Sequence, residues 1–206
     1  METALASMLA LQEEINRSVH PDWRSQAFPW YRAVWIECAE LLDQYGWKWW
    51  KRQEADREHL VLELVDIWHF GLSMLLLAGY DAPRLARELA EALRDPPAGE
   101  FPDLLERFAG RALVERTFDL PLFAALARAV GLEFSELHRR YVAKNVLNRF
   151  RQDHGYAEGR YRKEWGGRED NAHLLELACA LDGDDPAFPE RLYAALAERY
   201  RAQGAA

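Results

Sequence analysis

The chain has 206 residues, half of them apolar, which is enough for one good-sized domain with a substantial core. Its net charge of −8 argues against a general nucleic-acid binder or an anionic-membrane binder, because both polyanions would be repelled. The two cysteines, Cys38 and Cys179, suggest neither a disulfide framework nor a zinc site, and we interpret both as small core residues.

Apolar residues recur at helical spacing along nearly the whole chain, and we find no convincing run of alternating polar and apolar residues. The sequence therefore predicts an all-α fold. Pro21, Gly46 and Gly79 mark the ends of the first three helices, and Asp95-Pro96-Pro97 interrupts the fourth. The expected helices cover residues 3–19, 26–45, 57–79, 83–95, 101–117, 120–130, 133–151, 172–181 and 187–203, to within about two to four residues at each end.

The first expected helix does not resemble a signal peptide, because it has acidic and amide groups at helical spacing in place of a basic start and an apolar stretch. The longest apolar helix, at 57–79, contains Glu63, Asp66 and His69, which argues against a membrane span. We therefore expect a cytoplasmic protein without a membrane partner.

Two carboxylate pairs lie on otherwise apolar helices: Glu37 with Glu40, and Glu63 with Asp66. Residues three apart share one side of a helix, and the neighbours on that side are apolar, so we expect these acids to face a core. Burying an ionised carboxylate is costly unless a positive group compensates it, and a multivalent cation is the simplest such group. The competing interpretation is a solvated helix face, which is the commoner origin of this spacing.

The ligand types restrict the metal. Oxygen donors without cysteine favour Mg2+, with Mn2+ as a substitute, over zinc. Carboxylate-held Mg2+ keeps positions open for water and for substrate phosphates, so the acids predict metal-assisted attack of water on phosphorus. A di-iron carboxylate bundle is an alternative because His69 follows Asp66 by three residues, but such sites use this pair twice and the sequence has one convincing copy.

The middle of the chain, residues 82–131, is rich in Arg, Glu, Ala and Leu at amphipathic helical spacing. Its charge pattern is typical of a solvated outer face, and it contains no arrangement of side chains that suggests chemistry. We expect a helical insertion or small lobe within a single domain that spans residues 1–206.

A basic segment at 144–171 provides the positive counterpart to the acids. Lys144, Asn148 and Arg151 are separated by four and three residues, so they share one helical face. The amide of Asn148 both donates and accepts hydrogen bonds, which suits the edge of a pyrimidine. Further polar groups follow between glycines, in a composition typical of a mobile loop that closes over an anion: Tyr156, Arg160, Arg162 and Lys163. For any one of these residues, a solvated surface position is the competing interpretation.

Three strings in the sequence resemble the dimeric, all-α dUTP diphosphatases, a family within the helical, MazG-like nucleoside triphosphate pyrophosphatases. They are FPWYRAVWIECAELLDQYGWKWWK at 28–51, ELVDIWHFGLS at 63–73 and KNVLNRFRQDHGY at 144–156. The last string is continued by the Lys163-containing loop and by Gly167-Arg168-Glu169-Asp170-Asn171. The resemblance covers both ends of the chain and omits the middle. It implies a helical bundle of the all-α NTP pyrophosphatase type and a homodimeric, Mg2+-dependent enzyme that hydrolyses dUTP, with dUDP as a second substrate, to dUMP.

The resemblance also implies roles for individual residues. The metal ligands would be Glu37, Glu40, Glu63 and Asp66, with Glu40 also acting as the catalytic base on a water that attacks the β-phosphorus. The phosphate contacts would come from Lys144, Arg151, Tyr156 and Lys163. Uracil would be recognised by Gln12, Asn16 and Asn148. We interpret the aromatic group Trp47, Trp49 and Trp50 as packing or dimer contacts.

Two alternatives stand beside dUTP hydrolysis. A MazG-like or dCTP-preferring nucleoside triphosphate pyrophosphatase would keep the metal residues and recognise a different base. A non-enzymatic helical scaffold would use its aromatic side chains as partner surfaces and pair its acids with internal arginines.

Overall fold

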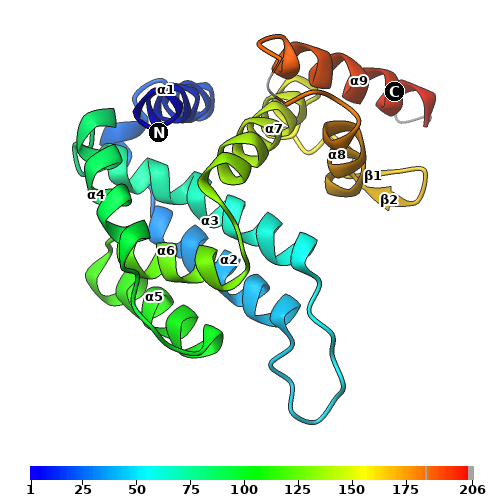
Figure 1. The fold of residues 1–206 in the computed structure, drawn as a ribbon. Helices are drawn as coiled ribbons and strands as arrows, with labels where there is room; N and C mark the ends of the chain where they lie inside the picture. Colours follow the sequence, from blue (N-terminus) through cyan, green and yellow to red (C-terminus); the bar gives the residue numbers. More distant parts are fainter. Residues whose placement is uncertain (184, 204–206) are drawn as a thin grey trace. The chain divides into compact units, whose positions relative to one another are not determined.

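The computed structural model describes residues 1–183 and 185–203, and over this part of the chain it confirms the predicted all-α fold (Figure 1). A short 3-10 helix, η1 (Trp23–Ser25), and a small hairpin of β1 (Glu164–Trp165) and β2 (Arg168–Glu169) complete the described elements. The α-helices are α1 (Glu2–Val19), α2 (Trp30–Tyr45), α3 (Arg57–Leu77), α4 (Ala82–Arg94), α5 (Phe101–Glu115), α6 (Leu120–Ala129), α7 (Phe134–Asp153), α8 (Asp170–Cys179) and α9 (Phe188–Ala202).

The chain forms two compact units, Met1–His138 and Arg139–Ala206, with the boundary inside α7. The first unit contains α1 to α6, and the second contains most of α7, the hairpin, α8 and α9. The helices of residues 82–131 pack inside the first unit, where α4 contacts α1 and α6, and α5 contacts α2 and α6. A single domain with an insertion in this region stays a prediction.

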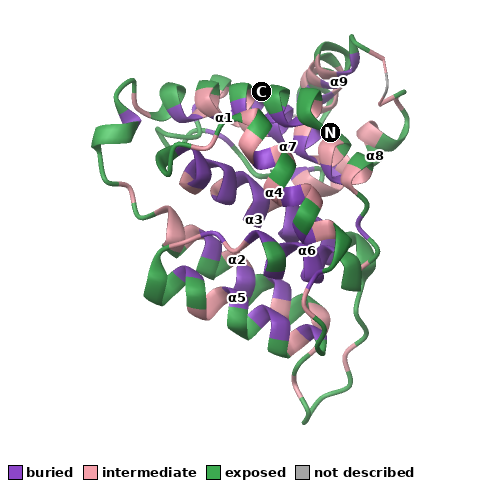
Figure 2. Cartoon of the chain, turned by 60° about the vertical axis from the view of Figure 1, so that its left-hand side comes forward, coloured by how far each residue is buried: buried purple, intermediate pink, exposed green. Residues whose placement is uncertain are grey.

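Helix α3 is the buried element of the first unit and packs against α1 and α2. Fourteen of its 21 residues are buried, and Figure 2 shows it mostly in the colour of buried residues. Its length and composition alone would allow it to cross a membrane, but 78% of its apolar window is buried inside the structure. A helix that is apolar on nearly all sides and covered by its neighbours is typical of the core of a soluble protein.

Several helices begin where the sequence places a capping residue. The side chains of Asp56, Asp81 and Asp119 accept hydrogen bonds from the backbone N–H groups of the first turns of α3, α4 and α6. Such caps satisfy donors that have no partner within the helix. The predicted starts of these helices, at residues 57, 83 and 120, lie within one residue of the observed ones.

Helix α2 begins at Trp30, four residues after the expected start at residue 26, which is the limit of the expected range. Ala27 has a left-handed φ of 53°, and the residue before Pro29 is kept out of the helical region by the proline ring.

The interpretation of both cysteines as core residues is half wrong, since Cys38 is buried but Cys179, at the end of α8, is exposed.

The second unit has its own apolar core, in which Phe150 of α7, Trp165 of the hairpin and Leu196 of α9 are all nearly inaccessible to solvent. The hairpin lies in a segment expected to be a loop. Its turn consists of Gly166 and Gly167, whose φ angles of 54° and 77° are both positive, as a tight hairpin turn of this kind requires. The hairpin ends at Glu169, so that α8 begins immediately after it with Asp170.

Candidate active site

Three of the four predicted metal-binding acids come together in the first unit. Glu37 of α2 and Glu63 and Asp66 of α3 each offer one carboxylate oxygen, and these oxygens all lie within 4.8 Å of one another. Glu63 is buried, whereas Glu37 and Asp66 are partly exposed. The packing of α2 against α3 thus brings two pairs that are distant in sequence into one group. Carboxylates this close repel one another, and a shared divalent cation relieves that repulsion with ligands it prefers.

The fourth acid, Glu40, is exposed on α2, so the expectation that all four acids face the core is wrong for this residue. The buried side of α2 is formed by Val34, Cys38 and Leu41. Glu37 lies at the edge of this buried side. Since each helical residue turns the direction by about 100°, Glu40 lies about 60° farther round the helix from it. Helix rotation therefore separates the surroundings of two acids that belong to one sequence motif.

Two residues predicted to recognise uracil, Gln12 and Asn16 of α1, are buried, with 4% and 2% of their surface exposed. Each donates a hydrogen bond of 3.0 Å from its amide nitrogen to the hydroxyl of Ser73 on α3. The Gln12 amide oxygen lies 3.1 Å from Nδ1 of His69, also on α3. Ser73 and His69 lie on α3 beyond Glu63 and Asp66. The buried amides of α1 therefore contact polar side chains that follow the acidic group along the same helix.

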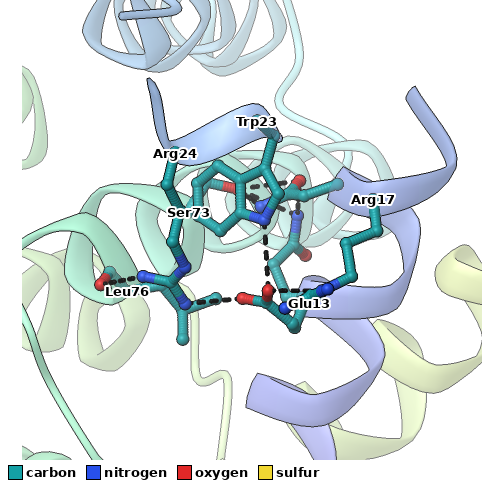
Figure 3. A network of polar contacts seen from close by, with 8 residues as sticks. Glu13, Arg17, Trp23, Arg24, Ser73 and Leu76 are labelled. Carbon is teal, nitrogen blue, oxygen red and sulfur yellow. Dashed lines mark hydrogen bonds and ion pairs between the residues drawn. The ribbon is translucent and has the colours of Figure 1, made fainter. Parts of the chain in front are cut away.

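A neighbouring polar network ties α1 to the end of α3 (Figure 3). The Glu13 carboxylate accepts hydrogen bonds from Arg17 at 2.7 Å, Arg24 at 2.6 Å and the Trp23 indole at 3.3 Å. Burial alone would raise the pKa of Glu13, but the hydrogen bonds from the two arginines outweigh it and lower the pKa. Arg24 also donates to the carbonyl of Leu76 at 2.8 Å, in the last turn of α3, where helix carbonyls lack intrahelical partners.

In the second unit, the predicted face of Lys144, Asn148 and Arg151 lies on α7. Lys144 is buried and donates to the amide oxygen of Asn171 at 3.1 Å. Arg151 donates from Nη1 to the amide oxygen of Asn148 at 3.2 Å. Each cation is therefore hydrogen-bonded to the oxygen of an asparagine amide.

Asp170, which was not among the predicted site residues, anchors this cluster. It has no exposed surface and accepts two hydrogen bonds of 2.8 Å from Arg151. The hydroxyl of Tyr161 donates a third, at 2.9 Å. Burial alone would raise the pKa of Asp170, but the contacts with Arg151 and Tyr161 outweigh it and lower the pKa. The sequence signal for Asp170 was its place in the Gly167-Arg168-Glu169-Asp170-Asn171 string, but its pairing with Arg151 depends on the hairpin that separates the two residues.

The other two predicted phosphate contacts, Tyr156 and Lys163, are exposed. The guanidinium carbon of Arg151 lies 5.9 Å from the centre of the Tyr156 ring. The carbonyl of Lys163 accepts a hydrogen bond of 2.8 Å from the backbone N–H of Asp170. The loop that carries both side chains is thus tied by its backbone to the start of α8.

Comparison with known protein families agrees with these features. A family model described as dUTPase matches residues 4–156, which include the acidic group, the buried amides of α1 and the polar face of α7. Among curated proteins, no match was found. Because the match covers most of the chain, the chain belongs to the dUTPase family.

Its activity follows from this membership. The chain is a dUTP diphosphatase, a hydrolase of nucleotide metabolism with a nucleotide as its substrate. The predicted family and enzyme class are confirmed, which sets aside the non-enzymatic scaffold.

Proposed function

We propose that the enzyme hydrolyses dUTP, and also dUDP, to dUMP with Mg2+ as its resident ion. The observation that carries this proposal is the group of carboxylate oxygens from Glu37, Glu63 and Asp66 within 4.8 Å of one another. Oxygen ligands from carboxylates fit Mg2+, and Mn2+ can replace it in such a site. Glu40 would complete the ligand set from the exposed side of α2.

A divalent ion held by these acids would polarise the phosphate oxygens and make water a stronger nucleophile at neutral pH. In the proposed reaction, Glu40 accepts a proton from a water molecule while the oxygen of that water forms a bond with the β-phosphorus of dUTP. The bond between the β-phosphorus and the oxygen bridging to the α-phosphorus breaks, and that oxygen leaves with dUMP. Pyrophosphate is the second product.

Basic residues would neutralise the charge of the substrate phosphates. We assign phosphate contacts to Lys144, Arg151, Tyr156 and Lys163. Cationic groups near a transferring phosphoryl group stabilise the charge that develops on its oxygens and on the leaving group. The exposed position of Tyr156 and Lys163 on a loop supports a role in which they engage substrate when it binds.

Uracil would be recognised by Gln12, Asn16 and Asn148. An amide distinguishes uracil from cytosine only if its orientation is fixed, because its two ends have opposite hydrogen-bond polarity. The hydrogen bonds of Gln12 and Asn16 with Ser73 support this assignment, since they restrain both amides.

A panel of nucleotides tests the substrate and the ion. We expect dUTP to give pyrophosphate and dUDP to give phosphate, each with dUMP, in the presence of Mg2+ and not after addition of EDTA. Phosphate and pyrophosphate are measured separately. A preference for dCTP, or indifference to the base, would instead support the dCTP-preferring or MazG-like alternative.

Glu63→Gln tests the metal site. The substitution keeps the shape of the side chain but removes a charged ligand, so we expect Mg2+ affinity and turnover each to fall about 100-fold or more. Mg2+ binding is measured by titration calorimetry, and turnover by pyrophosphate release. Glu106→Gln, on the exposed side of α5, is the matched control and should behave as the wild type. Full Mg2+ binding by Glu63→Gln would contradict the assignment.

We also propose that the enzyme is a cytoplasmic homodimer. The burial of α3 supports a soluble protein, and the exposed tryptophans between α2 and α3 support an interface between two copies of the chain. No nucleic-acid or membrane partner is proposed, because the net charge is negative.

A further inference from the structure

The contact between Arg151 and Asn148 fixes which end of the Asn148 amide faces the cation. Arg151 Nη1 donates to the amide oxygen of Asn148 at 3.2 Å. A guanidinium group has donors only, so it cannot pair with the amide nitrogen, which is also a donor. The orientation of Asn148 therefore follows from the chemistry of its partner, without any need to see hydrogen atoms. The remaining polar end of Asn148 is its NH2 group, a hydrogen-bond donor.

Arg151 itself is held in place by buried partners. Asp170 binds it through two parallel hydrogen bonds of 2.8 Å, a geometry that fixes the plane of the guanidinium as well as its position. Tyr161 donates to Asp170 at 2.9 Å and so restrains the carboxylate. Asp170 is fully buried and Arg151 is only 11% exposed, so neither group can leave the other without leaving a charge unpaired in the interior.

An amide that presents only its NH2 group to the base has the hydrogen-bond polarity that uracil requires. Uracil has a carbonyl at C4, which accepts a hydrogen bond, whereas cytosine has an amino group there, which donates one. An amide that presents its NH2 group donates a hydrogen bond to the C4 carbonyl of uracil. With cytosine, the same NH2 group would face another donor, and a site with such a mismatch rejects the wrong base strongly.

We propose that Asp170 and Tyr161 are positioning residues for base selection: through Arg151 they hold Asn148 with its NH2 group toward the base, and so set the preference for dUTP over dCTP. This inference rests on the proposed role of Asn148 in recognising uracil. It gives Arg151 a second task beside phosphate binding. Its Nη1 atom donates to the amide of Asn148, while Nε and Nη2 each donate one hydrogen bond to Asp170.

The first test is Asn148→Asp, which replaces the NH2 group by an acceptor and leaves an oxygen to pair with Arg151. The ratio of kcat/KM for dUTP to that for dCTP should fall at least about tenfold, with dCTP gaining relative to dUTP. A general loss of structure or of phosphate binding would lower both values together. An unchanged ratio would overturn the donor polarity assigned to Asn148.

The second test removes the anchor. The double variant Arg151→Gln with Asp170→Asn replaces the ion pair by two neutral amides, so no buried charge is left unpaired. Gln can face Asn148 with either end, which removes the constraint on its orientation. We expect the dUTP to dCTP ratio to fall at least about fivefold, with a rise in KM for dUTP. Tyr161→Phe, which removes only the third hydrogen bond to Asp170, should change the ratio in the same direction to a smaller extent.

Two controls separate base selection from other effects. Lys163→Gln removes a proposed phosphate contact and should lower activity on both nucleotides without changing their ratio. Arg149→Gln, at an exposed position of the same helix, should leave both values unchanged.

If the double variant folds, as judged by circular dichroism, and keeps the wild-type ratio, the positioning role is wrong. If the double variant does not fold, Tyr161→Phe decides in its place, and an unchanged ratio in that variant likewise overturns the role. If the wild type itself shows no preference for dUTP over dCTP, the proposed function is wrong instead.

Discussion

At the scale of single residues, the two acids of α2 illustrate how position on a helix separates roles. Glu37 belongs to the group of carboxylates, whereas Glu40 is exposed. We expect Glu37→Gln to lose Mg2+ affinity and turnover together, because it removes a central ligand. Glu40→Gln should lose turnover by about 100-fold or more with a smaller loss of Mg2+ affinity than Glu37→Gln, as expected for an exposed ligand that also acts as the general base. Titration calorimetry and steady-state kinetics on both variants provide the comparison. Equal losses of Mg2+ affinity would show that Glu40 acts chiefly as a ligand.

The lowered pKa of Asp170 predicts a specific dependence of stability on pH. A carboxyl group whose pKa is lower in the folded state stabilises the fold when it is ionised. Its contribution is therefore fully present above the ordinary pKa of 3.8 and is lost as the pH falls from there through the lowered value. Asp170→Asn should make the free energy of unfolding less dependent on pH in this acidic range, as measured by urea denaturation. Asp103→Asn, at an exposed position in α5, is the control and should keep the wild-type slope.

At the scale of elements, the packing of α3 depends on a close approach at Gly71. A Cβ atom on Gly71 would lie 2.1 Å from the ring of Phe118, which itself packs against Trp68 and Phe108. Gly71→Ala should therefore lower the free energy of unfolding by about 1–3 kcal/mol, since a closed core relieves such a clash only by shifting the ring or the helix. The measurement is urea denaturation followed by circular dichroism.

Gly110 of α5 offers the matched control, because a Cβ atom there would meet nothing within 4 Å in the part of the chain that the structure describes. Gly110→Ala should be neutral or should stabilise the protein by about 0.5–1 kcal/mol, owing to the better helix propensity of alanine. Equal effects of the two substitutions would show that the contact between Gly71 and Phe118 is not the source of the difference.

At the scale of the whole molecule, the exposed aromatic group between α2 and α3 bears on assembly. Trp49 and Trp50 are 85% and 59% exposed, and their rings contact each other and Trp47. Exposed clusters of large aromatic side chains are typical of protein interfaces. Sedimentation should give twice the chain mass of 23.9 kDa for the wild type, and the double variant Trp49→Ser with Trp50→Ser should shift the protein toward the monomer. Val114→Ser, at another highly exposed apolar position, should not. A double variant that remains dimeric would place the interface elsewhere.

The sequence by itself determined the helical fold and much of the candidate site. The apolar patterns of α3, α4 and α6 are local signals, so the sequence predicted these helices closely. The acidic group was also recognisable, because Glu63 interrupts a helix that is otherwise apolar. The shared helical face of Lys144, Asn148 and Arg151 was recognisable as well. These features depend on spacing along one helix, which the sequence contains directly.

Only the tertiary structure decided the features that depend on rotation or on distant partners. The packing of α2 on α3 determined that Glu37 joins the acidic group while Glu40 is exposed. The turn of the hairpin brought Asp170 to Arg151, and the packing of α1 on α3 paired Gln12 with Ser73. The physical reason is the same in each case. A hydrogen bond, an ion pair or a cluster of carboxylates formed by residues far apart in the chain depends on how helices and hairpins pack, and local periodicity does not specify that packing.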